Sequence, residues 1–466
     1  MMQSLRCLGA AAVLTVVVSC AVGPDYHRPK FDTSPNFKEA GDWKPSEPND
    51  VFNRGPWWET FKDDALSQLE VRIDISNENV KAAAAAYDQA RALVAQARAG
   101  FWPSVGVSAA KQRGSTNGGR TLTTDSAGIS ANWDLDIWGQ IRRSTESSRA
   151  SAQASAAALA AARLSAQSAL ATDYFELRAQ DQLQRLLDDT VVAEELSLKI
   201  AESRYKFGVA ARADVVSAQA HLLSSQAQQV NAKIQRGILE HAIAVLIGQQ
   251  PAAFSLSPSS MRTDVPTVPA GIPSTLLERR PDVAQSERTV AAANAQIGVA
   301  KSAFFPSLTL SGSEDYTGPN WSHLFLVPNR IWSVGPQLAE TLFDGGLRRA
   351  QVAQARAAYD LSVDNYRQTV LAGFQQVEDD IVTLRVLEQQ AVIEEAAVAA
   401  AREAEKLTLN QYKAGTVPYS SVITAQTTRL SAEETALSVL SSRLQASVAL
   451  IEAVGGGWDA AQLPLP

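Results

Sequence analysis

Two turn sequences in this chain are near copies of each other, separated by 207 residues when counted from Tyr205 to Tyr412. The first reads SRYKFGVAARADVVSAQ and the second reads NQYKAGTVPYSSVITAQ. Each turn follows a long tract whose apolar residues recur every three or four positions, which is the period of an amphipathic helix. A turn that is repeated between such tracts predicts a helical hairpin that occurs twice.

The helical tracts are too long for an ordinary globular domain. At ~1.5 Å per residue, the tract over 141–207 would extend for roughly 100 Å. Helices of that length are typical of coiled coils or of α-helical barrels. The predicted helical tracts are 64–100, 141–207, 213–248, 281–302, 346–414 and 419–454.

The N-terminus has the features of an export signal. Arg6 precedes an apolar stretch at Leu8–Ser19, which is shorter than the ~20 residues that a membrane span needs. Cys20 follows a small residue at the expected processing point, and this pattern resembles a bacterial lipobox, in which the cysteine becomes lipid-modified. We therefore predict a lipid anchor on Cys20, the alternative being an ordinary secretory signal with an incidental cysteine.

Four segments alternate apolar and polar residues with the period of a β-strand. In the second of them, Ile129 and Trp133 fall on one face, while Asn132 and Asp134 fall on the other. In a soluble sandwich the apolar face would be a core, but this chain is predicted to be exported and aromatic residues cluster at the strand ends, as in outer-membrane barrels. The predicted strands are 103–111, 127–137, 306–314 and 331–340.

A sheet of four strands cannot close into a barrel around a pore. Unpaired strand edges in lipid cost several kcal/mol per unsatisfied backbone group, so several chains must contribute strands. Three chains would supply about 12 strands, a size that leaves an open lumen.

Composition and motifs argue against catalysis and against nucleic-acid binding. The formal net charge is -7 at pH 7, and the charged residues are spread along the chain. The four histidines lack metal-ligand spacing, and Gly455–Gly457 is not followed by the residues of a phosphate loop. We expect neither an enzyme nor a cofactor or metal site, apart from a covalent lipid on Cys20.

Four longer motifs occur in order along the chain. They are CAVGPDYHRP at Cys20–Pro29, PWWETFKDDALSQL at Pro56–Leu69, LLERRPDVAQSERTVAAANAQIGVAKSAFFPSLTLSG at Leu276–Gly312 and EAVGGGW at Glu452–Trp458. This set resembles the outer membrane factor family, the TolC-like trimeric channels of bacterial efflux pumps, and within it the lipoprotein branch typified by OprM and NodT.

The resemblance implies a mainly α fold with a membrane β-barrel. A duplicated strand–strand–long helix–turn–helix unit would form, as a homotrimer, a barrel of about 12 strands that a periplasmic α-helical barrel continues. The implied domains are a signal peptide (1–19), a lipid-anchored N-terminal segment of an equatorial region (20–63), a first repeat (64–248), an equatorial linker (249–280), a second repeat (281–454) and a C-terminal tail (455–466).

The resemblance also implies an outer-membrane exit duct. Such a duct passively conducts drugs or other small toxic molecules that it receives from a periplasmic adaptor and an inner-membrane transporter of the RND type. It would be embedded in outer-membrane lipid and project into the periplasm. Two alternatives stay open at this point: a metal-ion or protein-secretion duct of the same fold, and a trimeric coiled-coil stalk.

The repeated turns are expected to form the periplasmic tip, where the pore closes and the adaptor docks. The two glycines of the turns should end their helices in left-handed geometry. Adaptor contact is expected at Tyr205, Lys206, Gly208, Lys413 and Gly415.

The resemblance places the gate at Asp214, Tyr412, Ser421 and Thr424. A Tyr412 hydroxyl that donates to the Asp214 carboxylate would form a charge-assisted hydrogen bond worth ~1.5–3 kcal/mol. Ser421 and Thr424 stand where many family members carry carboxylates, so we expect this gate to select cations less strongly.

Overall fold

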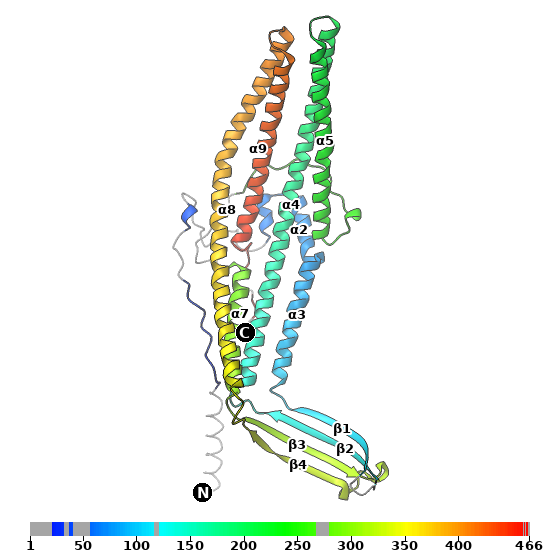
Figure 1. The fold of residues 1–466 in the computed structure, drawn as a ribbon, viewed down its shortest axis with the longest axis vertical. Helices are drawn as coiled ribbons and strands as arrows, with labels where there is room; N and C mark the ends of the chain where they lie inside the picture. The colour runs from blue at the N-terminus through cyan, green and yellow to red at the C-terminus, as the bar shows by residue number, and fades with distance from the viewer. Residues whose placement is uncertain are drawn as a thin grey trace.

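The computed structural model describes residues 21–31, 37–40, 56–115, 121–266, 279–459, 461 and 463–464. The molecule is elongated: long helices run along its axis, and a four-stranded sheet lies at one end, tilted from that axis (Figure 1). None of the described helices combines the length and the hydropathy that crossing a membrane requires. Cys20 and the predicted signal peptide lie outside the described residues.

The chain contains two copies of one unit, as the repeated turns predicted. The long helices of the two copies have 67 and 68 residues, and the helices that follow the turns have 35 residues each. Each copy opens with a 22-residue helix ahead of its strands. The first copy contains α3 (Glu78–Ala99), β1 (Ser104–Ser115), β2 (Thr121–Asp134), α4 (Gln140–Lys206) and α5 (Arg212–Leu246), and the second contains α7 (Pro281–Ser302), β3 (Ser307–Gly318), β4 (Arg330–Ala339), α8 (Leu347–Ala414) and α9 (Tyr419–Ala453).

The prediction of one helix over 64–100 is wrong, because the chain breaks at Asn77. The Asn77 backbone is extended, with ψ 121°, and its side chain accepts a hydrogen bond from the Val80 amide at 3.0 Å. An asparagine in this position caps a new helix. The segment is therefore two helices, α2 (Asp64–Ser76) and α3.

The largest hydrophobic core lies where short segments wrap the long helices, midway along the rod. The 3₁₀ helix η4 (Trp57–Phe61) places the ring of Phe61 4.8 Å from that of Phe175 in α4, measured between centroids. Ile73 of α2 and Ile451 of α9 are buried in the same core. The core therefore joins the N-terminal segment to both repeats.

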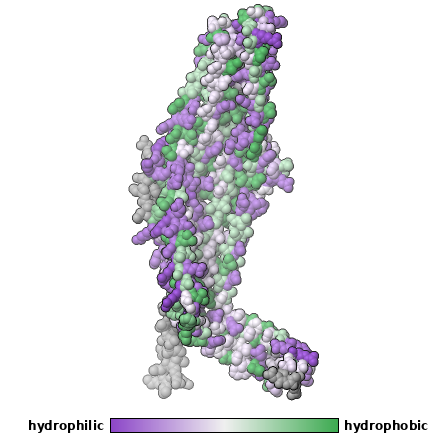
Figure 2. All heavy atoms as spheres, viewed as in Figure 1, coloured by the Kyte–Doolittle hydropathy of each residue, from purple (hydrophilic) through white to green (hydrophobic). Residues whose placement is uncertain are grey.

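The helices pack side by side, with α3, α5 and α8 at the edges of the layer. Near the sheet, α4 and α7 lie between α3 and α8, and toward the tip α4 and α9 lie between α5 and α8. Along α5, the exposed residues Val216, Leu223 and Val230 recur every seven positions, which is the spacing of a coiled-coil seam. Hydrophobic side chains recur along this edge (Figure 2). The edge is thus suited to packing against a helix of another chain.

The sheet has an apolar and a polar face over the half nearest the helices, as predicted, but charged residues enter the apolar face farther out, where Glu314 pairs with Ile129. The strands follow the order β1-β2-β3-β4, and neighbouring strands are antiparallel. Directly paired residues share a face: Val107 pairs with Ile129 on the apolar face, and Ser130 pairs with Ser313 on the polar face. Polar side chains gather at the far end of the sheet (Figure 2). β1 and β4 each keep one unpaired edge.

The first hairpin of the sheet is longer than predicted. β1 continues to Ser115 and β2 begins at Thr121, whereas the sequence pattern placed these ends at 111 and 127. The polar sequence there indicates a loop, but backbone pairing persists, with Gly114 still opposite Leu122. Ladder hydrogen bonds do not depend on apolar alternation, so the pattern underestimates the strands.

Two equivalent glycines let each outgoing helix end against the start of its own repeat. A Cβ at Gly248 would lie 2.1 Å from the Ser76 carbonyl oxygen, and one at Gly455 would lie 2.0 Å from the Arg279 carbonyl oxygen. Both glycines have positive φ, at 67° and 98°. Glycine is required at both places because any side chain would collide with a backbone atom.

Gly455→Ala is expected to cost about 2 kcal/mol of folding free energy, because backbone strain adds to the collision. Gly208→Ala is the matched control: its φ is 71°, but nothing lies within 4 Å of the added Cβ. It should therefore lose only the strain contribution of about 1 kcal/mol. Thermal unfolding followed by circular dichroism compares the two variants, and equal losses would contradict the steric explanation.

Candidate functional site

The two repeated turns lie at the end of the rod farthest from the sheet (Figure 1). In the α4–α5 turn, Gly208 has φ 71° and the next amide donates to the Arg204 carbonyl at 2.8 Å. In the α8–α9 turn, Gly415 has φ 80° and the next amide donates to the Gln411 carbonyl at 3.0 Å. The predicted left-handed glycines are confirmed, and both helices end in the same motif.

Tyr205 and Tyr412 occupy equivalent repeat positions but lie in different environments. Tyr205 is 46% exposed, whereas Tyr412 is 2% exposed. The Tyr412 ring packs edge-on against Tyr419, with centroids 5.1 Å apart, in an apolar cluster that includes Ala201 of α4 and Ala218 of α5. Only the second tyrosine therefore belongs to the joint between the two hairpins.

Arg204 joins the two hairpins, and sequence reasoning missed it. Its guanidinium carbon lies 4.9 Å from the centroid of the Tyr412 ring, and Nη1 donates to the Lys413 carbonyl at 2.7 Å. The cation thus satisfies a carbonyl in the last turn of α8 and complements the negative end of that helix. In the sequence, Arg204 is one more basic residue at a helix C-terminus, so no signal distinguished it.

The predicted hydrogen bond between Tyr412 and Asp214 does not form within one protomer. The Tyr412 hydroxyl is buried, and it has no hydrogen-bond partner in the part of the chain that the structure describes. Burial raises the pKa of Tyr412, and the negative charge of Asp214 adds to that rise. Asp214 lies in the first turn of α5, where its charge stabilises the helix N-terminus.

Ser421 and Thr424 lie in the first turns of α9, beside the joint between the hairpins. Thr424 is exposed, and its hydroxyl donates to the Ser420 carbonyl of its own helix at 3.0 Å. Ser421 is half-buried. Val417 packs against the apolar cluster of Tyr412. These positions thus place no ionised side chain at the tip.

The α4–α5 turn presents apolar side chains to solvent. Phe207 is 77% exposed and Val209 is 63% exposed, next to the predicted contact residue Tyr205. Exposed apolar groups gathered on one turn are typical of a contact surface. Sequence reasoning missed Phe207 and Val209, although apolar residues inside a turn were the signal that could have found them. The other predicted contact residues are exposed as well: Lys206, Gly208, Lys413 and Gly415.

Below the tip, polar contacts connect α4 with α5 and α9. His221 of α5 lies between Glu194 of α4, with Nδ1 2.9 Å from Oε1, and Thr427 of α9, with Nε2 3.2 Å from Oγ1. Gln426 of α9 donates to the Ser197 hydroxyl of α4 at 3.1 Å. Over the described ranges, no three His, Cys, Asp or Glu side chains are grouped so that they could hold a metal ion.

The segment that follows Cys20 lies at the junction between sheet and helices. The Val22 amide donates to the Trp138 carbonyl at 3.0 Å. Ala21 packs so closely on Gly139 that a Cβ there would lie 2.9 Å from the Ala21 Cα. Ala21 is thus held where the sheet gives way to α4.

The sheet has two different faces and open edges, and it is joined to helical hairpins whose long helices have 67 and 68 residues. Together these features define a membrane channel that several copies of one chain build together. A family model described as outer membrane efflux protein matches residues 72–249 and 272–456, and the chain belongs to this family. The family resemblance and the fold class that the sequence predicted are confirmed.

Relatives and solved structures match over nearly the whole chain. The toluene efflux pump outer membrane protein TtgC of Pseudomonas putida is 28% identical over 464 residues, which cover 97% of this chain and 95% of TtgC. The pyoverdine export outer membrane protein OpmQ of Pseudomonas aeruginosa is 30% identical over 430 residues, covering 88% and 89%. The structure of the outer-membrane channel OprN superposes with a TM-score of 0.86 at 29% identity, covering 94% of this chain and 100% of that one.

Proposed function

We propose that three copies of this chain form the outer-membrane exit duct of a tripartite efflux pump. The sheets close into one barrel of about 12 strands, and the helical hairpins continue the duct into the periplasm. Solutes cross passively after a periplasmic adaptor and an inner-membrane transporter deliver them. The chain performs no catalysis, and the transporter supplies the energy.

The observation that carries this proposal is the sidedness of the sheet together with its two open edges. On the apolar face, Val107 is 83% exposed and Val334 is 69% exposed in the single chain, and contact with lipid would cover both. Pairing of β1 from one copy with β4 of the next would satisfy backbone groups that lipid cannot. A coiled-coil stalk requires neither feature, so we favour the duct over the stalk.

A lipid anchor on Cys20 is supported by the position of the next residue. Ala21 lies at the sheet–helix junction, against Gly139. Acyl chains on Cys20 would therefore enter the membrane that the sheet crosses, and they would add a second attachment to the barrel.

The exposed α4–α5 turn is the surface that we assign to the adaptor. Phe207 and Val209 supply apolar contact area, and Lys206 supplies a charge beside them. Exposed apolar side chains rimmed by polar groups are the usual composition of a protein–protein contact. The transporter that works with this adaptor is inferred to be of the RND type.

We assign small organic molecules rather than metal ions as the cargo. Ser421 and Thr424 place no carboxylate at two of the four gate positions, which leaves Asp214 as the one acidic residue among them. The gate therefore concentrates cations less strongly than one with carboxylates at these two positions. The relatives TtgC and OpmQ are named for toluene and pyoverdine, which are organic compounds.

Single-channel conductance in planar bilayers tests two claims: that the protein conducts ions, and that the contacts of Arg204 hold its tip closed. Wild type should give small or flickering currents, and Arg204→Ala should raise the conductance, because it removes the link from α4 to the Lys413 carbonyl. The lost hydrogen bond and cation–π contact are together worth about 2 kcal/mol, so the open population should rise at least ~10-fold. Tyr412→Phe is the matched control and should behave like wild type, since it keeps the aromatic ring over which the Arg204 guanidinium lies.

The possible results separate the lock from the duct. Equal conductance of wild type and Arg204→Ala would show that Arg204 does not hold the tip closed, but it would not contradict the duct. Absence of ion current from every variant would contradict the duct itself and favour a structural stalk.

A further inference from the structure

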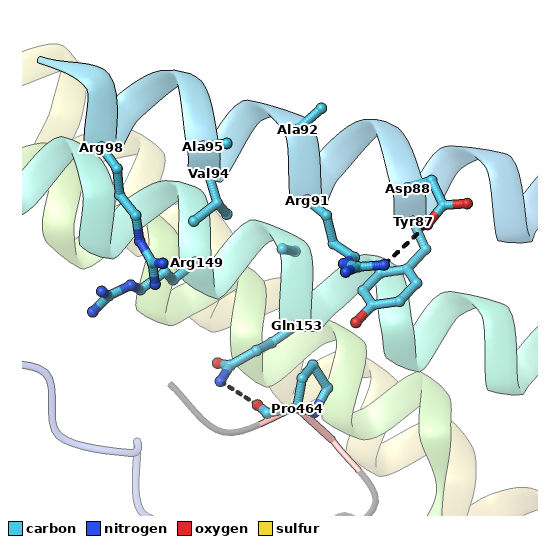
Figure 3. Close-up of a pocket in the computed structure, with 11 residues that line it drawn as sticks. Tyr87, Asp88, Arg91, Ala92, Val94, Ala95, Arg98, Arg149, Gln153 and Pro464 are labelled. Carbon is cyan, nitrogen blue, oxygen red and sulfur yellow. Dashed lines mark hydrogen bonds and ion pairs between the residues drawn. The ribbon is translucent and has the colours of Figure 1, made fainter.

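A pocket lies between α3 and α4, away from the tip (Figure 3). Its volume is about 520 Å³, which is within the range of small-molecule sites. Residues of α3 and α4 form its walls, together with Pro464 of the C-terminal tail. Gln153 of α4 donates to the Pro464 carbonyl at 2.9 Å and so holds the tail at the pocket.

Two arginines at one end of this pocket have no counter-charge among the described residues. Arg98 of α3 and Arg149 of α4 extend toward each other (Figure 3). Neither side chain forms a hydrogen bond or an ion pair with a residue that the structure describes, and the Nε of Arg149 is buried without a partner. Facing guanidinium groups repel each other, and a buried donor without a partner costs free energy. An anion between them would remove both penalties.

The third arginine of the pocket, unlike the other two, has a partner for its charge among the described residues. Arg91 pairs with Asp88 at 3.4 Å, and its guanidinium carbon lies 5.8 Å from the centroid of the Tyr87 ring. Between the two ends the wall includes the small apolar residues Ala95 and Ala152. The pocket therefore combines a compensated aromatic end, an apolar wall and an uncompensated basic end.

The basic end is the one nearest the sheet. Arg98 is in the last turn of α3, which ends at Ala99, and β1 begins at Ser104. Arg149 lies on the order of 14 Å along α4 from the first residue of that helix, Gln140. With the sheet in the membrane, the periplasmic headgroup layer, roughly 5–8 Å thick, lies against this junction. Arginine side chains are long enough to reach such a layer from nearby helix positions.

We propose that Arg98 and Arg149 bind the phosphate of an anionic phospholipid headgroup from the periplasmic leaflet. Guanidinium groups present paired donors that match phosphate oxygens, and two such groups neutralise the charge of one phosphodiester. The apolar wall accommodates the glycerol portion of the lipid. The site rests on the proposed placement of the sheet in the membrane, but its binding assay needs no channel activity.

Native mass spectrometry of the detergent-solubilised protein with dioctanoyl phosphatidylglycerol tests the site. Wild type should retain this lipid, and the double variant Arg98→Gln/Arg149→Gln should bind it about tenfold more weakly or worse. The control Arg367→Gln/Lys406→Gln removes two exposed cations of α8 that pair with acids, and it should bind like wild type. Unchanged size-exclusion elution and unfolding temperature confirm that the pocket variant is folded.

Each result that would contradict the proposal contradicts a different part of it. Equal lipid binding by wild type and the pocket variant, or an equal loss in the α8 control, overturns the site. Competition by inorganic phosphate at millimolar concentration, with no added affinity from the lipid, reassigns the arginines to a free anion and overturns the headgroup proposal. Phosphatidylcholine should bind more weakly, since it has no net charge, and equal binding of the two lipids overturns the charge argument. Retained phosphatidylglycerol binding in a protein without ion current contradicts the duct while leaving this site standing.

Discussion

Asp181→Ala is expected to destabilise the protein by about 3–5 kcal/mol, because it leaves buried arginine charge without its partner. Asp181 Oδ2 lies 2.9 Å from Arg178 Nη1, and Oδ1 lies 2.7 Å from Arg236 Nε. The Asp181 side chain is fully buried and that of Arg178 is 5% exposed. The Asp181 carboxylate also accepts from the Ser259 amide at 3.1 Å, and Arg178 donates to the Ser257 carbonyl at 2.8 Å. Asp181 thus fastens the segment after the first repeat to α4 and α5.

Two measurements check this result. The unfolding temperature of the purified protein should fall, and trypsin should cleave after Arg262 faster, because the segment around Ser259 is released. Asp189→Ala is the matched control, since Asp189 is an exposed aspartate of the same helix, and it should change neither quantity by much. If Asp181→Ala unfolds and is cleaved like the control, the carboxylate does not hold the segment.

Glu70→Gln is expected to stabilise the protein at neutral and alkaline pH. Glu70 of α2 is fully buried, and its carboxyl oxygens have no hydrogen-bond partner in the described ranges of the chain. Burial, together with the charge of Asp74, raises the pKa of Glu70 from 4.5 to about 9. The folded protein therefore keeps Glu70 protonated at pH 7, while the unfolded chain releases the proton.

The sign of the pH dependence follows from the raised pKa of Glu70. Below pH 4.5 the side chain is protonated in both states, and from there to about pH 9 the wild-type protein loses stability as pH rises. At pH 7 this loss amounts to about 3 kcal/mol, which glutamine avoids. Unfolding temperatures at pH 5, 7 and 9 test the prediction. The gap between variant and wild type should widen with pH, whereas the exposed control Glu78→Gln should show a constant gap. A gap for Glu70→Gln that does not change with pH would mean that the folded protein ionises Glu70 at neutral pH.

The tip shows where prediction from sequence succeeded and where it failed. The turns, their glycines and their equivalence between repeats depend on local backbone conformation, which Gly208 and Gly415 determine through φ. The roles of Tyr205 and Tyr412 could not be predicted from nearly identical sequences, because one faces solvent and the other is covered by the opposite hairpin. The predicted bond from Tyr412 to Asp214 is absent within one protomer, where Arg204 instead reaches the Tyr412 ring across the joint between hairpins.

The sequence by itself determined the duplicated hairpin, the length of its helices and the two faces of the sheet. These features follow from periods of 3.6 and 2.0 residues and from glycine at the turns, and such patterns act between residues close in the chain. Only the tertiary structure decided which charges become partners. Asp181 meets Arg236 across two helices, Glu70 meets no donor among the described residues, and Arg98 and Arg149 face each other from α3 and α4. Charged side chains look alike in a sequence, and their energies depend on distance and burial, which exist only after the helices have packed.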